Sequence, residues 1–181
     1  MLGNDIVDLN LAKKQSNWRR KNYLSKIFSP AEQQLVQEAK NPDLVVWLLW
    51  SMKEAAYKIV NRKTNRQRYD PLAFGCTFTL GQSQAQGMVR YEDQSFSTCS
   101  TINTDFIFTL CIAEGINFED VNIINDLNRP DYMRVFNDRY SDLKLGKNEK
   151  KLPEIYNFHT QTNHMATVSH HGDHLAIAYL R

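Results

Sequence analysis

Residues 43–62 constrain the fold of this chain more than any other segment. They follow a helix-start signal, Asn41-Pro42, and most of their positions are apolar. Among the apolar side chains are Trp47, Leu48, Leu49, Met52, Ala55, Ala56, Ile59 and Val60. An α-helix with apolar residues around most of its circumference packs inside a protein rather than on its surface. We therefore expect a long, largely buried helix here.

Two charged residues, Glu54 and Lys58, interrupt this apolar helix. They are four residues apart and so share one face, with Trp50 one turn earlier. On a protein surface such a pair contributes only about 0.2–0.5 kcal/mol. In a buried helix, however, a carboxylate and an amine need a partner or a ligand. At this point both a surface ion pair and a functional site stay open.

The rest of the sequence predicts a mixture of helices and strands. We expect helices at residues 13–27, 29–40 and 130–145. We expect strands at residues 2–9, 74–80, 87–92, 96–102, 105–113, 152–158 and 165–180. Residues 120–128 fit a strand or a loop. No repeat or linker divides the chain, so we predict one α+β domain over residues 1–181, an N-terminal strand and helices followed by an antiparallel sheet.

Composition and charge exclude several classes of protein. The net charge of +2 is too small to indicate nucleic-acid binding by itself, and no apolar run reaches the roughly 20 residues of a membrane-spanning helix. The N-terminus lacks the pattern of a signal peptide. The three cysteines are widely spaced and odd in number, which favours reduced thiols in a cytoplasmic protein.

Basic residues gather in two places. Arg19, Arg20 and Lys21 are consecutive, and residues 53–68 contain six cations against the single acid Glu54. The six cations are Lys53, Lys58, Arg62, Lys63, Arg66 and Arg68. They fit either a solvated helix end or a surface that attracts phosphates or an acidic partner.

Asp5 lies in a β-like run near the start of the chain. A single aspartate in such a place is usually a strand-end or turn residue. If Asp5 and Glu54 converge, their oxygens form a site suited to Mg²⁺, with Mn²⁺ as the alternative, because these hard cations prefer oxygen ligands. A pyrophosphate group would complete the coordination of the ion.

The five histidines all fall in the last quarter of the chain: His159, His164, His170, His171 and His174. Their spacing matches no familiar metal-ligand pattern, so we expect most of them to be structural. His170 is the exception. It follows Ser169 and precedes Gly172-Asp173, where a strand end and a glycine turn could present donors to a phosphate.

Three motifs, taken together and in this order, resemble the 4′-phosphopantetheinyl transferase superfamily. They are Gly3-Asn4-Asp5-Ile6, the Trp-Ser-Met-Lys-Glu-Ala-Ala-Tyr-Lys run at residues 50–58, and Ser169-His170 before an apolar strand. The motif order is that of the small holo-(acyl-carrier-protein) synthase type. About residues 80–151 carry no motif of this family.

The resemblance implies a phosphopantetheinyl-transferase-like fold and a Mg²⁺-dependent enzyme. It would move the 4′-phosphopantetheine arm of coenzyme A to a serine of an apo acyl or peptidyl carrier protein, releasing 3′,5′-ADP. By resemblance, Asp5 and Glu54 hold the metal, and Glu54 also helps to deprotonate the serine. Lys58 binds the phosphates and assists the leaving group, while Ser169 and His170 bind the adenosine-side phosphate of coenzyme A.

The resemblance also implies an acidic carrier as partner and a homo-oligomer, most simply a trimer. In such an assembly His170 of one subunit would lie beside Asp5 and Glu54 of a neighbour. A third carboxylate found in larger relatives is absent, because Val7 occupies its position. The main alternative is a non-catalytic module that binds a carrier protein or coenzyme A. A nucleic-acid-binding protein ranks last, since no such motif is present.

Overall fold

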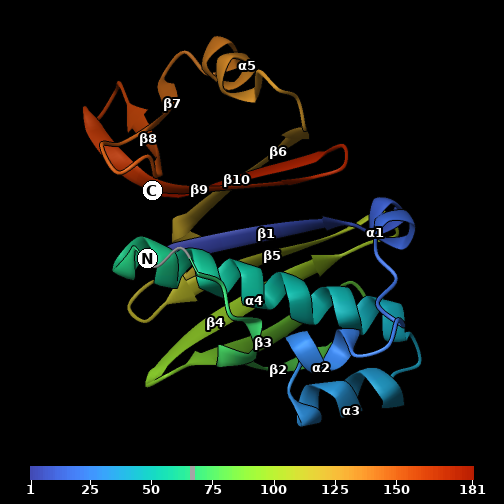
Figure 1. Cartoon of the computed structure of the whole chain (residues 1–181). Helices are drawn as coiled ribbons and strands as arrows, with labels where there is room; N and C mark the ends of the chain where they lie inside the picture. The colour runs from blue at the N-terminus through green and yellow to red at the C-terminus, as the bar shows by residue number, and fades with distance from the viewer. Residues whose placement is uncertain (66–67) are drawn as a thin grey trace.

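The computed structural model describes residues 1–65 and 68–181 and contains two antiparallel sheets with helices packed against them (Figure 1). The first sheet has the strand order β1 (Leu2–Asp8), β5 (Phe106–Ala113), β4 (Gln94–Ile102), β3 (Gln84–Tyr91), β2 (Phe74–Leu80). The second has the order β6 (Val121–Leu127), β10 (His174–Leu180), β9 (Thr162–His171), β8 (Pro153–Asn157), β7 (Leu143–Lys147). These elements confirm the predicted α+β class with antiparallel pairing.

The long helix α4 (Pro42–Thr64) covers one face of the first sheet, as Figure 1 shows, and it is buried over much of its length as predicted. The Asn41 side chain caps its start by accepting a hydrogen bond from the Leu44 N–H. Asn65, in the left-handed conformation, ends it. The helix and the sheet together enclose the largest apolar core.

Strand β1 lies between α4 and the second sheet, and its side chains point alternately toward one and the other. Val7 packs in the core that contains α4, whereas Leu2 and Ile6 pack with apolar residues of the second sheet. Gly3 faces α4 so closely that an added Cβ would lie 2.1 Å from the Ala55 carbonyl oxygen. Asp5 follows Gly3 by two residues and therefore also faces α4.

The remaining helices are short: α1 (Leu9–Gln15), α2 (Tyr23–Ile27), α3 (Pro30–Glu38), α5 (Tyr132–Arg139), and the 3₁₀ turns η1 (Pro71–Ala73) and η2 (Phe118–Asp120). The prediction of one helix over residues 13–27 is wrong. Asp8 caps a helix that begins earlier, by accepting from the Leu11 N–H, and Asn22 adopts a left-handed conformation that separates α1 from α2. None of the described helices combines the length and apolar character needed to cross a membrane.

The second half of the chain departs from prediction in two further places. Residues 130–145 do not form one helix, because α5 ends at Arg139 and β7 begins at Leu143. The Asn137 side chain assists this change by accepting a hydrogen bond from the Leu145 N–H at 2.7 Å. Residues 165–180 form a hairpin of β9 and β10, whose turn contains Gly172 at a φ of 56°. The ambiguous residues 120–128 become η2 and β6.

A buried ion pair ties α3, α4 and β2 together. Lys53 is fully buried, and its Nζ donates to Glu32 Oε2 at 2.9 Å and to the carbonyl oxygens of Pro71, at 2.9 Å, and Phe74. Glu32 Oε2 also accepts from the Ser29 N–H at the start of α3. All three ammonium hydrogens of Lys53 therefore have acceptors, which is the condition for a stable buried charge.

Replacing Glu32 by alanine is expected to lower the free energy of unfolding by about 3–5 kcal/mol, because it leaves the Lys53 ammonium buried without its counter-charge. Urea unfolding would measure the loss. Glu38→Ala is the matched control, since Glu38 is an exposed residue of the same helix. A Glu32→Ala protein as stable as the control would show that the ion pair is not a structural tie.

Candidate active site

Asp5 and Glu54 line one pocket of about 260 Å³ between β1, α1, α4 and the end of β9. Asp5 comes from the face of β1 that packs on α4, and Glu54 projects from the middle of α4. The close approach of the two elements at Gly3 and Ala55 brings the two carboxyl groups into one site. The predicted convergence of Asp5 and Glu54 is thus present in the geometry.

Both carboxyl groups hold their protons more tightly than isolated carboxyl groups do. Burial raises the pKa of Asp5 to about 6, although the Lys58 charge acts in the opposite direction. Burial and the nearby Asp5 charge raise the pKa of Glu54 to about 7. At neutral pH, Asp5 is largely ionised and Glu54 is close to half-ionised, so a base and an acid are both available.

The carboxylate pair has the chemistry of a site for a hard cation. Among the described residues, Asp5 Oδ2 is buried and has no hydrogen-bond partner, so an acceptor oxygen is available. The same residues contain no group of three or more His, Cys, Asp or Glu side chains placed to hold a metal. Two protein carboxylates fit Mg²⁺, which usually keeps several waters or substrate phosphate oxygens as its other ligands.

Lys58, one turn after Glu54 on α4, lies next to the carboxylate pair. Its Nζ lies 3.9 Å from Asp5 Oδ1 and donates to the carbonyl oxygens of Asn4, at 2.6 Å, and Val168, at 3.3 Å. Two of the three ammonium hydrogens are therefore used inside the protein, and one is left for a ligand. Lys58 thus spans β1 and β9 as well as the predicted site.

Strand β9 runs beside β1 in the same direction, joined to it by side chains. Thr167 Oγ1 donates to Asn4 Oδ1 at 2.9 Å, and the Asp8 N–H donates to His171 Nδ1 at 2.9 Å. Ser169 lies between these two contacts on the same face of β9, because side chains two residues apart in a strand share a face. It therefore faces β1, and its hydroxyl is buried and without a partner in the described structure.

Two cations of α4 donate hydrogen bonds to the backbone edge of β9 that no described strand pairs with. The last residue of β9 that pairs with β8 is Met165. Beyond it, the Ala166 carbonyl oxygen accepts from Arg62 Nη2 at 2.5 Å, and Val168 accepts from Lys58. Arg62 also donates to the carbonyl oxygen of Pro153 in β8. One turn of α4 therefore fixes the second sheet against the first.

His170 lines the pocket that contains Asp5 and Glu54 within a single chain. The prediction that His170 of a neighbouring subunit is needed at this position is therefore wrong for the described structure. The strands from the segment without motifs, β6 among them, place the hairpin of His170 against β1. The oligomeric state itself stays a prediction.

The cations of residues 53–68 do not form one exposed surface, so that interpretation is wrong. Lys53 is fully buried, and Lys58 and Arg62 bind backbone carbonyl oxygens. Arg66 lies outside the described residues. Lys63 and Arg68 are exposed, but a larger group of exposed cations lies on and around α1 and α2, in residues 9–31, which contain no acid: Lys13, Lys14, Arg19, Arg20, Lys21 and Lys26.

Several residues at the site were not predicted from sequence. Asn4 is fully buried and donates from Nδ2 to the Ala176 carbonyl oxygen at 3.0 Å, which links β1 to β10. Its only signal was a polar residue inside an apolar strand. Tyr69 packs beside the site, 4.6 Å from Tyr57 and 5.8 Å from Trp50 between ring centroids. Tyr69 carried no local signal, because the segment that positions it is irregular.

Asp5→Asn is expected to stabilise the metal-free protein at pH 8 by about 1–2 kcal/mol. Both carboxyl groups have raised folded-state pKa values, so the stability linked to their protonation is complete below about pH 4 and is lost as the pH rises through 6 to 7. The difference should shrink at pH 5, where the unmodified pair is mostly protonated.

Urea unfolding with a chelator present, at pH 5 and pH 8, would measure this effect. Asp93→Asn is the control, because Asp93 is exposed in the turn between β3 and β4. Equal stability of the Asp5→Asn and unmodified proteins at pH 8 would contradict the repulsion between Asp5 and Glu54.

Comparisons with known proteins identified a matching family model and a similar solved structure. A family model described as the 4′-phosphopantetheinyl transferase superfamily matches residues 1–111, which include Asp5, Glu54 and Lys58 and exceed half of the chain. Comparison with curated protein sequences gave no match. Among solved structures, the holo-acyl-carrier-protein synthase of Thermotoga maritima is similar at 12% sequence identity, with 84% of this chain and 83% of that chain covered and a TM-score of 0.46.

Proposed function

Because this chain belongs to the 4′-phosphopantetheinyl transferase superfamily, we propose that it transfers the 4′-phosphopantetheine arm of coenzyme A to a serine of an apo carrier protein. The observation that carries the proposal is the meeting of Asp5, Glu54 and His170 in one pocket, with Lys58 beside Asp5. At about 260 Å³ the pocket is smaller than the ~300–1,000 Å³ of sites that enclose a whole ligand. A substrate as long as coenzyme A would therefore lie only partly within it.

The proposed reaction forms one bond and breaks one bond at phosphorus. The carrier serine oxygen attacks the phosphorus of the phosphopantetheine group, and the bond from that phosphorus to the 3′,5′-ADP oxygen breaks. Glu54, directly or through a water, takes the serine proton; its pKa is about 7 in the metal-free protein, and a bound cation would lower it and favour the ionised form that accepts a proton. Phosphoryl transfer of this kind depends mainly on positioning and on charge neutralisation.

The other residues neutralise charge and hold the substrate. The remaining hydrogen of the Lys58 ammonium donates to a phosphate oxygen and stabilises the departing 3′,5′-ADP. His170, at the pocket wall, and Ser169, the preceding residue of β9, contact the adenosine-side phosphate. Asp5 and Glu54 would hold Mg²⁺, or Mn²⁺, which would supply positive charge to the pyrophosphate of coenzyme A.

Incubation with coenzyme A, Mg²⁺ and a panel of apo carrier proteins, followed by mass spectrometry of the carriers, tests the proposal. A carrier that gains one phosphopantetheine group would support it. Binding of coenzyme A with no carrier modified would favour the alternative, a non-catalytic module. The buried, unpartnered oxygen of Asp5 supports the enzyme, because a binding module has no need of such a costly group.

Glu54→Gln is expected to reduce the transfer rate by at least about 100-fold, since the amide can neither take a proton nor bring the same charge to the site. The change keeps the side-chain shape, so the protein should remain folded. Glu38→Gln, an exposed position on α3, is the control for the same chemical change. Near-normal turnover of Glu54→Gln on a carrier that the unmodified protein modifies would remove Glu54 from the mechanism.

The exposed cations of residues 9–31 support an acidic carrier as the partner. Ala12, Gln15 and Tyr23 of this segment line the pocket of Asp5 and Glu54, so the basic surface adjoins the proposed site. A negatively charged carrier approaching there would be attracted over roughly a Debye length, ~8–10 Å at physiological ionic strength. Its serine would then enter beside Glu54.

Reversing the charges of Lys14 and Lys21 to glutamate is expected to weaken carrier binding by about tenfold or more at low salt, with little effect on coenzyme A binding. The loss should diminish as salt is added, because the charges are exposed. The double variant Lys150→Glu, Lys151→Glu makes the same change of net charge between β7 and β8, far along the chain from α1. An equal loss in both variants would assign the effect to net charge rather than to this surface.

A further inference from the structure

We propose that the Tyr69 hydroxyl donates a hydrogen bond to the substrate phosphoryl group that lies against Glu54. This inference rests on the proposed function and adds a binding residue to it. Residue 69 belongs neither to the motifs of residues 3–6 and 50–58 nor to the Ser-His segment.

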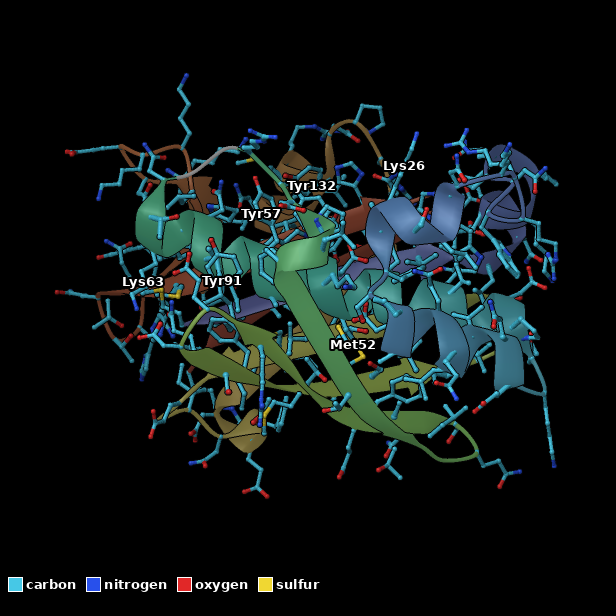
Figure 2. The ribbon with its side chains drawn as sticks, turned by 60° about the horizontal axis from the view of Figure 1, so that its bottom comes forward. Lys26, Met52, Tyr57, Lys63, Tyr91 and Tyr132 are labelled. Atoms are coloured by element: carbon cyan, nitrogen blue, oxygen red, sulfur yellow. The ribbon has the colours of Figure 1, made fainter. Side chains whose placement is uncertain are left out.

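The ring of Tyr69 is held against α4 by aromatic side chains. It meets Trp50 edge-on at 5.8 Å and packs tilted on Tyr57 at 4.6 Å and on Phe74 at 5.9 Å, measured between ring centroids. Figure 2 shows Tyr57 beside the start of β2, where Phe74 lies. These contacts fix the ring, so its hydroxyl has a defined position rather than a range of them.

The hydroxyl of Tyr69 is buried and has no hydrogen-bond partner among the described residues. A buried phenol without a partner costs free energy, which is recovered only when an acceptor arrives. Phenylalanine would fill the same aromatic space without that cost. The neighbouring Tyr57 differs, because its hydroxyl accepts a hydrogen bond from Asn61 Nδ2 at 3.3 Å. Tyr69 is therefore a donor for which the described residues supply no acceptor.

The position of Tyr69 indicates which acceptor it meets. Trp50, Glu54 and Tyr57 share one face of α4 because they are spaced by four and three residues, and Tyr69 packs on the first and third of them. Burial raises the pKa of the Tyr69 hydroxyl most, and the charges of Glu54 and Asp5 raise it further, ahead of those of Cys76 and Glu32. Lys58 lies one turn after Glu54 and beside Asp5, whereas Tyr69 packs on Trp50, one turn before Glu54. The two donors therefore flank Glu54 along α4.

Phosphate oxygen is the acceptor that this arrangement fits. A phosphoryl group brought against two carboxylates needs donors around it, and a neutral phenol supplies one without adding a charge to be buried. Lys58 has one hydrogen left for this purpose, so a second donor on the opposite side of Glu54 completes the contacts. A carboxylate or phosphate that accepts such a bond makes it stronger than one between neutral groups.

Tyr69→Phe and the matched control Tyr57→Phe would test the inference on the full-length protein. Calorimetry would measure the binding of coenzyme A and, separately, of inorganic pyrophosphate, both with Mg²⁺. Tyr69→Phe should weaken both ligands by about tenfold or more, the size expected for a lost bond to a charged acceptor. Tyr57→Phe should change either affinity less than about twofold. The thermal midpoint of Tyr69→Phe should be equal to or above that of the unmodified protein, because an unpaired buried group is removed.

Each other outcome has a separate meaning. Weakened coenzyme A binding with unchanged pyrophosphate binding would overturn the phosphoryl assignment, since Tyr69 would then contact another part of coenzyme A. Unchanged binding of both ligands, or a lowered thermal midpoint with equal losses in Tyr57→Phe, would overturn the inference and leave the proposed transfer intact. If the unmodified protein binds neither ligand, both the inference and the proposed function fail.

Discussion

The unpaired edge of β9 is the constraint on which the candidate site depends. Strand β8 pairs with β9 only as far as Met165, so the backbone beyond it forms no ladder with another described strand at that edge. A buried carbonyl oxygen without a partner costs about 1–3 kcal/mol. Lys58 and Arg62, one turn apart on α4, donate to this edge and hold β9 beside β1. The same contacts place His170 in the wall of the pocket and hold the Lys58 ammonium beside Asp5.

The site is therefore built from groups that would destabilise the fold if nothing bound there. Burial raises the pKa values of Asp5 and Glu54, and the hydroxyl of Ser169 is buried without a partner in the described structure. Buried polar groups of this kind are tolerated when the rest of the fold over-determines their positions. The Lys53–Glu32 pair and the close packing of Gly3 on α4 provide that rigidity. Stability elsewhere thus maintains a polar site prepared for a charged ligand.

Features that depend on contacts within a few residues could be predicted from the sequence, and features that depend on contacts between distant elements could not. The helix α4 was predictable because its apolar residues and its Asn41 cap act within a few residues. Asp5 and Glu54 were paired through motif order, not through any local physical signal. The separation of α1 from α2 was missed, since it depends on Asp8 capping from the end of β1. The partner of Lys53 was also out of reach, because Glu32 lies on another helix.

The segment of about residues 80–151 carried no motif, yet the geometry of the site depends on it. Its strands β3, β4 and β5 join β2 to β1 and so build the sheet on which α4 rests. Its strand β6 pairs with β10, and the β9–β10 hairpin then crosses back to β1. A segment with this role needs alternating apolar residues of suitable size rather than fixed identities. A segment that only positions other residues is therefore expected to lack a motif. The pairing of its strand β6 with β10 explains how His170, distant in sequence, reaches the carboxylates of its own chain.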